Sequence, residues 1–112
     1  MNPSDLYADA LSALTAARAC MLSPDWQNAI DQESSDQRLA ASRALIQVQQ
    51  AIIALSNETL SDIASAMQAN GIQLSQATKG LQEALDDITK VATVMNSLSA
   101  LLQVVSKILP LL

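Results

Sequence analysis

Four carboxylates come closest to forming a chemical site in this chain. Glu58 and Asp62 are four residues apart, as are Glu83 and Asp87, so each pair would share one face of a helix. Carboxylates inside a helical bundle can hold metal ions, but such sites also use the histidine of a Glu-x-x-His motif. The 112-residue sequence contains no histidine. We therefore expect these carboxylates to form a solvated face and to bind no metal.

The absence of histidine also removes most schemes of general acid–base catalysis and the Ser–His and Cys–His nucleophile pairs. Cys20 is the only cysteine, and Arg18, the basic residue nearest to it, would lie on a different side of a helix. The chain has two glycines and no glycine-rich phosphate-binding loop. These residue types predict a protein that is not an enzyme and that binds no cofactor or small-molecule substrate.

The composition indicates one helical domain over residues 1–112. Half of the residues are hydrophobic, only 2% are aromatic, and glycine and proline are rare. Such a sequence is typical of a nearly all-helical protein. The net charge is −5, and the six basic residues are scattered. Nucleic acid is therefore not an expected partner, because phosphate binding needs clustered Lys and Arg.

A heptad pattern is the strongest signal in the sequence. Apolar residues recur every seven positions over more than half of the chain, which is typical of helices that pack lengthwise on one another. This predicted seam consists of Leu39, Ile46, Ile53, Leu60, Met67, Leu74, Leu81, Ile88, Met95, Leu102 and Leu109. The seam specifies architecture and carries no chemistry.

The pair Asn70-Gly71 is the only break in this pattern. Glycine is favoured just past the end of a helix because it adopts a positive φ without a steric clash. We therefore predict a turn there and an antiparallel hairpin of two long helices, residues 35–69 and 73–109, with Leu60 opposite Leu81. The alternative is one continuous helix in an extended coiled coil, since the heptad phase continues through the break.

A shorter helix over residues 5–22 precedes the hairpin. Ser23-Pro24 should end it and can open a short helix within the linker 23–34. Ser34 and Gln37 fit a capping box that starts the second helix. Because the apolar stripe is widest at the open end of the hairpin, we expect the first helix to pack there. The predicted fold is an all-α, three-helix-bundle-like or coiled-coil-like domain.

The C-terminal run from residue 98 is apolar, almost uncharged and the sharpest functional candidate. It can be the core of the three-helix end, a docking surface for a second subunit, or a segment that inserts into a membrane. The candidate interaction residues in and beside this run are Leu101, Val104, Val105, Ile108, Leu111 and Leu112.

Together these patterns predict a non-catalytic helical interaction protein. It would associate with itself or bind another protein through apolar helix faces, as a bacterial assembly subunit, a secretion accessory or a small acidic immunity protein does. The alternative is a protein that acts on membranes or lipid surfaces, such as a subunit of a pore-forming toxin. The first residues show no basic segment before an apolar one. We therefore expect a cytoplasmic location, or export without a cleavable signal peptide.

Overall fold

The computed structural model describes residues 2–109, which form six helices and so confirm the predicted all-α class. The described part measures 43 × 25 × 19 Å. The helices are α1 (Pro3–Met21), α2 (Pro24–Asp31), α3 (Ser35–Asn57), α4 (Leu60–Ala69), α5 (Gly71–Ala84) and α6 (Val91–Ile108).

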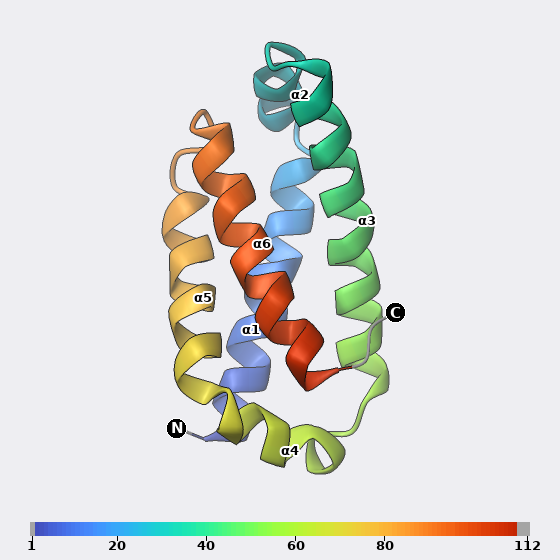
Figure 1. Cartoon of the computed structure of the whole chain (residues 1–112), viewed down its shortest axis with the longest axis vertical. Helices are drawn as coiled ribbons and strands as arrows, with labels where there is room; N and C mark the ends of the chain where they lie inside the picture. The colour runs from blue at the N-terminus through green and yellow to red at the C-terminus, as the bar shows by residue number, and fades with distance from the viewer. Residues whose placement is uncertain (1, 110–112) are drawn as a thin grey trace.

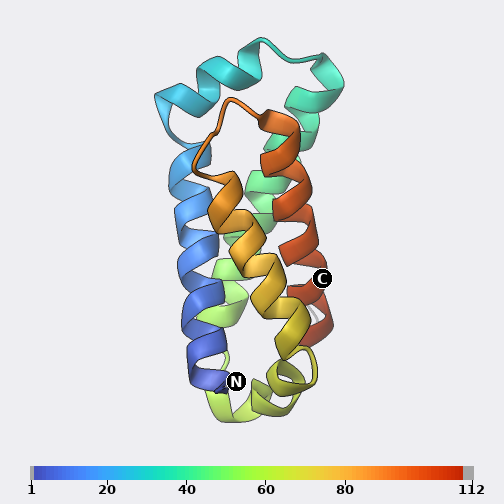
Figure 2. The same cartoon turned by 90° about the vertical axis from the view of Figure 1, so that its left-hand side faces the viewer.

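The four longer helices form a bundle around one core, with α1 and α5 running one way and α3 and α6 the other (Figure 1). The neighbours around the bundle are α1 with α5, α5 with α6, α6 with α3, and α3 with α1. The short helices α2 and α4 lie across opposite ends (Figure 2). Each apolar helix face therefore has two partners, as a bundle core requires.

Helix α4 explains how α3 reaches α5, which lies diagonally across the bundle. Neighbouring helices are about 10 Å apart, so a diagonal is about 14 Å. The 10 residues of α4 span about 15 Å at ~1.5 Å per residue. Helix α4 crosses beneath the bundle and packs on α1 and α6 as it does so (Figure 1).

The predicted helix starts near residues 23 and 34 are confirmed. Ser23 caps α2 by accepting a hydrogen bond from the backbone N–H of Trp26, and Pro24 occupies the first helical position. Ser34 caps α3 by accepting one from the N–H of Gln37. The side chain of Asn2, and not that of Ser4, caps α1. The first helix therefore begins at Pro3, two residues before its predicted start.

The predicted hairpin of two long helices is not the arrangement of this protein. The first predicted long helix, 35–69, ends at Asn57, and a new helix begins at Leu60. Thr59 and Asp62 fit the Ser/Thr-x-x-acid pattern of a helix N-terminus, and the Thr59 hydroxyl donates to the Asp62 carboxylate. The predicted layer of Leu60 on Leu81 would require an uninterrupted helix through this new helix start.

The second predicted long helix, 73–109, is interrupted between Ala84 and Val91. Glu83, Asp86 and Asp87 cluster where α5 ends, and negative charge opposes the dipole at a helix C-terminus. The Asp87 carboxylate accepts hydrogen bonds from the backbone N–H and the hydroxyl of Thr89, which stabilises a turn. This turn joins α5 and α6 as antiparallel neighbours.

The predicted break at Asn70-Gly71 is present but has another geometry. Asn70 separates α4 from α5, and its side-chain amide donates to the carbonyl of Ala66. Among residues 2–109 no glycine has a positive φ, so Gly71 starts α5 and does not form the expected C-terminal cap. Ile72, the next residue, is 70% exposed and so makes no apolar contact of the kind that accompanies a glycine helix cap. The chain bends sharply here and does not fold back on itself.

Helix α3 packs into the core with a different heptad from the predicted one. Its buried residues are Ala41, Ala44, Val48, Ala51 and Leu55. They also follow a spacing of three and four, and this row starts two residues after Leu39, or about 200° around the helix. The predicted seam residues Leu39, Ile46 and Ile53 therefore point to solvent.

The remaining seam residues divide between the core and its margin. Met67, Leu74, Leu81 and Leu109 are buried, as predicted. Leu60, Ile88, Met95 and Leu102 are only partly buried against the core. Ile88 lies in the turn between α5 and α6, outside any helix. The seam prediction is thus wrong for α3, whereas its residues Met67, Leu74 and Leu81 in α4 and α5 are buried.

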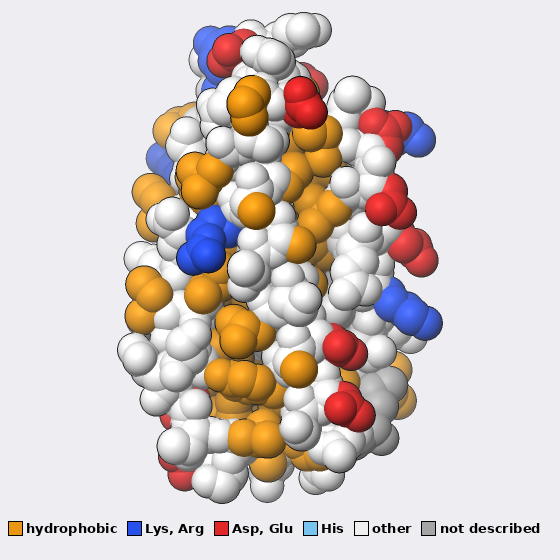
Figure 3. All heavy atoms as spheres, turned by 180° about the vertical axis from the view of Figure 1, so that it is seen from behind, with side chains coloured by type: hydrophobic (Ala, Val, Ile, Leu, Met, Phe, Trp, Pro, Cys, Tyr) orange, Lys and Arg blue, Asp and Glu red, His pale blue; other side chains and the backbone are white. Residues whose placement is uncertain are grey.

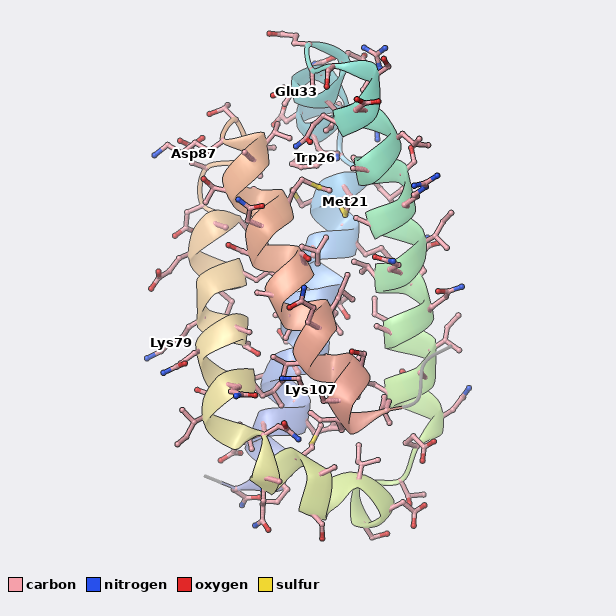
Figure 4. The ribbon with its side chains drawn as sticks, in the orientation of Figure 1. Met21, Trp26, Glu33, Lys79, Asp87 and Lys107 are labelled. Carbon is pink, nitrogen blue, oxygen red and sulfur yellow. The ribbon has the colours of Figure 1, made fainter. Side chains whose placement is uncertain are left out.

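Two large side chains close the end of the core beneath α2. Met21 ends α1, and Trp26 lies on the inner face of α2; both are almost fully buried (Figure 4). The opposite end is tied by Tyr7, whose hydroxyl donates to the carbonyl of Leu55 at 2.7 Å. Leu55 lies in the last turn of α3, where carbonyls have no partner within the helix. This bond joins the start of α1 to the end of α3.

Candidate interaction surfaces

The structure separates the four carboxylates that could have formed a metal site. Glu58 and Asp62 flank the start of α4, whereas Glu83 and Asp87 lie near the end of α5, at the opposite end of the bundle (Figure 1). Glu58 and Glu83, which the predicted hairpin would have placed at the same level, therefore lie far apart along the bundle. Residues 2–109 contain no group of three or more side chains placed to hold a metal ion.

Asp87 has a structural role in its turn. The hydroxyl of Thr89, then its backbone N–H, and the nearby charge of Lys90 favour the ionised carboxylate and lower the pKa of Asp87. Figure 4 shows Asp87 at the edge of the bundle, pointing away from the core. Both hydrogen bonds lie within the turn between α5 and α6. The lowered pKa of Asp87 therefore reflects its role in stabilising this turn.

Cys20 is half-buried near the end of α1, and burial raises the pKa of its thiol. A raised pKa keeps the sulfur protonated at neutral pH and makes it a poor nucleophile. The structure thus gives Cys20 the environment of a small apolar residue.

The C-terminal run is mostly core, which corrects four of the six predicted interaction residues. Leu101, Val104, Val105 and Ile108 are buried inside the bundle and are not part of its exposed surface. Leu111 and Leu112 lie outside the described residues. The four buried residues belong to α6, whose wide apolar arc faces its two neighbours α5 and α3 and not the predicted helix 5–22.

Helix α6 is the one helix within residues 2–109 that is long and apolar enough to cross a membrane by length and composition. Its inward face carries the buried aliphatic residues, and its outward face carries polar residues such as Asn96, Gln103 and Lys107. This amphipathic division is the pattern of a core helix. In the folded bundle the buried aliphatic side chains of α6 pack against its neighbouring helices.

The main exposed apolar feature is the outer row of α3, formed by Leu39, Ile46 and Ile53. Their side chains are 51%, 55% and 60% exposed. They are spaced by seven residues, or about 10 Å, along one line on the side of α3 that faces away from the core. Single exposed aliphatic residues are common on soluble proteins, but an aligned row of three marks a face on which another helix can pack.

The neighbours of the outer row are polar, which is the sequence signal that separates it from a core seam. Ser42 and Gln49 follow Leu39 and Ile46 by three residues, and Arg43 and Gln50 follow them by four. A core seam needs a second apolar row at one of these spacings. The Ala41–Leu55 heptad has one in Ala44 and Ala51, so it takes the core position.

A second apolar surface follows the outer side of α1. A shallow depression of about 640 Å³ is lined by Tyr7, Ala8, Leu11, Ser12, Thr15, Ala16 and Ala19. Figure 3 shows hydrophobic side chains along the middle of this face and along its left edge, over α3, whereas acidic side chains lie mainly on its right-hand side. The small residues leave room for a partner to approach the backbone of α1.

A small polar cleft lies between α1 and α5. It has a volume of about 150 Å³ and is lined by Leu6, Asp9, Ser75, Thr78, Lys79 and Gln82. Thr78 is 4% exposed, and its hydroxyl has no hydrogen-bond partner among residues 2–109. Asp9, Lys79 and Gln82 are exposed at its rim. The cleft is too small for most metabolites, and its two charged residues, Asp9 and Lys79, lie at the exposed rim.

Comparison with models of known protein families, with curated proteins and with solved structures found no match to this chain.

Proposed function

We propose that this chain is a non-catalytic helical assembly protein that associates with a second copy or with another protein through its exposed apolar helix faces. The observation that carries the proposal is the outer row of α3, in which three aliphatic side chains are aligned and more than half exposed. Aligned apolar side chains on a polar helix surface are the usual basis of helix–helix recognition between chains.

The composition of the surface supports association with protein more than association with lipid. Helices that lie on membranes carry Lys and Arg on the polar face and aromatic anchors at its border. Here Tyr7 and Trp26 are the only aromatic residues. Trp26 is buried, and Tyr7 is half-buried with its hydroxyl bonded to α3. The net charge of −5 also opposes binding to anionic lipid.

Light scattering over a range from micromolar to millimolar protein, together with flotation on anionic and neutral vesicles, tests this proposal. We expect the mean mass to rise with concentration, or a protein partner to bind with a defined stoichiometry, and we expect no flotation. Flotation of the folded protein would instead support the membrane-active alternative. A monomer that neither associates with protein nor floats would contradict both functions.

The depression on α1 supplies a matched comparison with α3. Ala16→Glu places a carboxylate on the α1 surface, and Ile46→Glu places one in the outer row. Both substitutions lie in helices and change net charge equally. If association is lost only in Ile46→Glu, then the α3 face is the contact; if it is lost only in Ala16→Glu, then the α1 face is. Circular dichroism checks that both variants stay folded.

A further inference from the structure

We infer that two copies of this chain associate through α3, with their helices antiparallel and related by a two-fold axis at Ile46. This inference rests on the proposed function and specifies its surface, its partner and its geometry. The occupant of the outer row is a second copy of the same row. The contact is isologous: when one residue of the first copy meets a second residue of the other copy, the same two residues also meet with the copies exchanged.

The spacing of the outer row is self-complementary. Leu39 lies seven residues before Ile46, and Ile53 lies seven residues after it. When the helices run antiparallel about Ile46, each Leu39 meets Ile53 of the other copy, and Ile46 meets its own equivalent. All six exposed side chains then enter three layers, none of which leaves a polar residue opposite an apolar one. The similar sizes of Leu and Ile keep the two helices evenly spaced.

Charge on α3 selects the antiparallel orientation over the parallel one. In a parallel two-fold pair the two borders of the row face each other, so Arg38 on one border lies beside Arg43 on the other border of the second copy. In the antiparallel pair, Arg43 instead lies beside Gln50 of the other copy, and Asp36 lies beside Asn57. Amide side chains can accept from Arg and donate to Asp. Like charges opposite each other would raise the energy of the parallel form.

Apart from Asp36, the acidic groups of the chain lie outside α3. The net charge is −5, yet residues 37–57, nearly the whole of α3, contain no acidic residue and only Arg38 and Arg43 as charged ones. In Figure 3, acidic side chains lie mainly on the right-hand side of the face shown, away from its left edge over α3. Two copies that meet along residues 37–57 therefore bring together none of the carboxylates that make the chain acidic.

The area of the face predicts a weak dimer. The 23 residues of α3 span about 35 Å, and a helix offers a contact about 10 Å wide. Each copy then buries about 350 Å², and the pair about 700 Å², against the roughly 1,200 Å² of a stable specific interface. We therefore expect dissociation in the high micromolar range or above, and a monomer–dimer equilibrium in place of a permanent dimer.

Single cysteines test both the face and the orientation. In a Cys20→Ser background, oxidation at high protein concentration should crosslink Ile46→Cys to itself. Leu39→Cys should not crosslink to itself, because the equivalent positions are about 21 Å apart in the antiparallel pair, far beyond the ~7 Å limit of a disulfide. A mixture of Leu39→Cys and Ile53→Cys should give the mixed dimer. Self-crosslinking of all three variants would overturn the antiparallel geometry.

A charge placed on the two-fold axis tests the energetics. Ile46→Glu brings two carboxylates together and should weaken dimerisation at least about 100-fold in sedimentation equilibrium. Ile72→Glu is the matched control, because Ile72 is also an exposed isoleucine but lies outside α3. It should leave the dimerisation constant unchanged.

The outcomes separate this inference from the proposed function. If the protein associates, but equally in Ile46→Glu and Ile72→Glu and without crosslinking of Ile46→Cys, the α3 dimer is overturned while an assembly function through another face stands. If the protein stays monomeric at millimolar concentration, the α3 dimer is overturned, and the assembly function then depends on a different protein partner. Loss of association in Ile46→Glu alone, with the expected crosslinks, supports both.

Discussion

Replacing Leu55 and Ile53 by alanine, one at a time, tests which heptad of α3 faces the core. These two residues are two positions apart on the same helix, but Leu55 is 1% exposed and Ile53 is 60% exposed. The predicted seam and the observed packing assign them opposite roles. The pair is therefore a direct comparison with nearly constant local sequence and helix position.

The expected magnitudes differ several-fold. Leu55→Ala leaves a cavity in the core and should lower the free energy of unfolding by about 3 kcal/mol. Ile53→Ala removes three carbons at about 0.8 kcal/mol per buried CH₂, and because two-fifths of the side chain is buried the loss is about 1 kcal/mol. The higher helix propensity of alanine offsets about half of that loss. The net cost of Ile53→Ala should be about 0.5 kcal/mol.

Urea denaturation followed by circular dichroism measures both values. With a slope of about 2 kcal/mol per M, Leu55→Ala should lower the midpoint by about 1.5 M and Ile53→Ala by about 0.25 M. Low micromolar protein keeps the chain monomeric, so that association does not add to the stability of the wild type. Equal shifts for the two variants would refute the orientation of α3 described above.

Two further predictions concern the upper end of the bundle and its turn. Trp26→Ala should lower the free energy of unfolding by about 3–5 kcal/mol, because Trp26 fills the core beneath α2; urea denaturation followed by circular dichroism measures it. Asp87→Asn should destabilise the protein slightly at neutral pH and not at strongly acidic pH. The pKa of Asp87 is lowered in the folded protein, so as the pH falls the unfolded chain takes up this proton at a higher pH than the folded protein does. The stabilising effect of the carboxylate is therefore lost as the pH falls through the folded pKa. Thermal denaturation of both proteins across the acidic range measures the difference.

Much of the fold follows from local signals that act within a few residues. The caps at Ser23 and Ser34 correctly placed the starts of α2 and α3, because a hydroxyl that accepts from a free backbone N–H is decided locally. The break at Asn70 was also placed correctly. Apolar periodicity continues through the interruptions after Asn57 and Ala84 and does not reveal them. The Thr59-x-x-Asp62 pattern and the acidic residues at the end of α5 do indicate them.

The orientation of α3 shows where periodicity alone is insufficient. Two heptads share this helix on opposite faces, and the larger side chains belong to the one that remains outside. Ala44 and Ala51 allow α3 to approach its neighbours closely. The row with the smaller side chains therefore faces the core. The polar residues beside Ile46 carried this information, because a core seam does not place Gln49 and Gln50 next to it. The predicted seam therefore places Leu39, Ile46 and Ile53 in the core, although they form the exposed outer row that is the main candidate interaction surface.

Replacing Thr78 by valine tests whether its hydroxyl costs stability. The side chain is buried on α5, and its hydroxyl finds no hydrogen-bond partner among residues 2–109. An unpaired buried hydroxyl costs about 1–3 kcal/mol, and valine has the same shape and a similar helix propensity. Thr78→Val should therefore raise the free energy of unfolding by about 1 kcal/mol. Thr78→Ser, which keeps the hydroxyl and loses the methyl, should lower it. A loss of stability in Thr78→Val would instead mean that the hydroxyl is hydrogen-bonded in solution, in the cleft between α1 and α5.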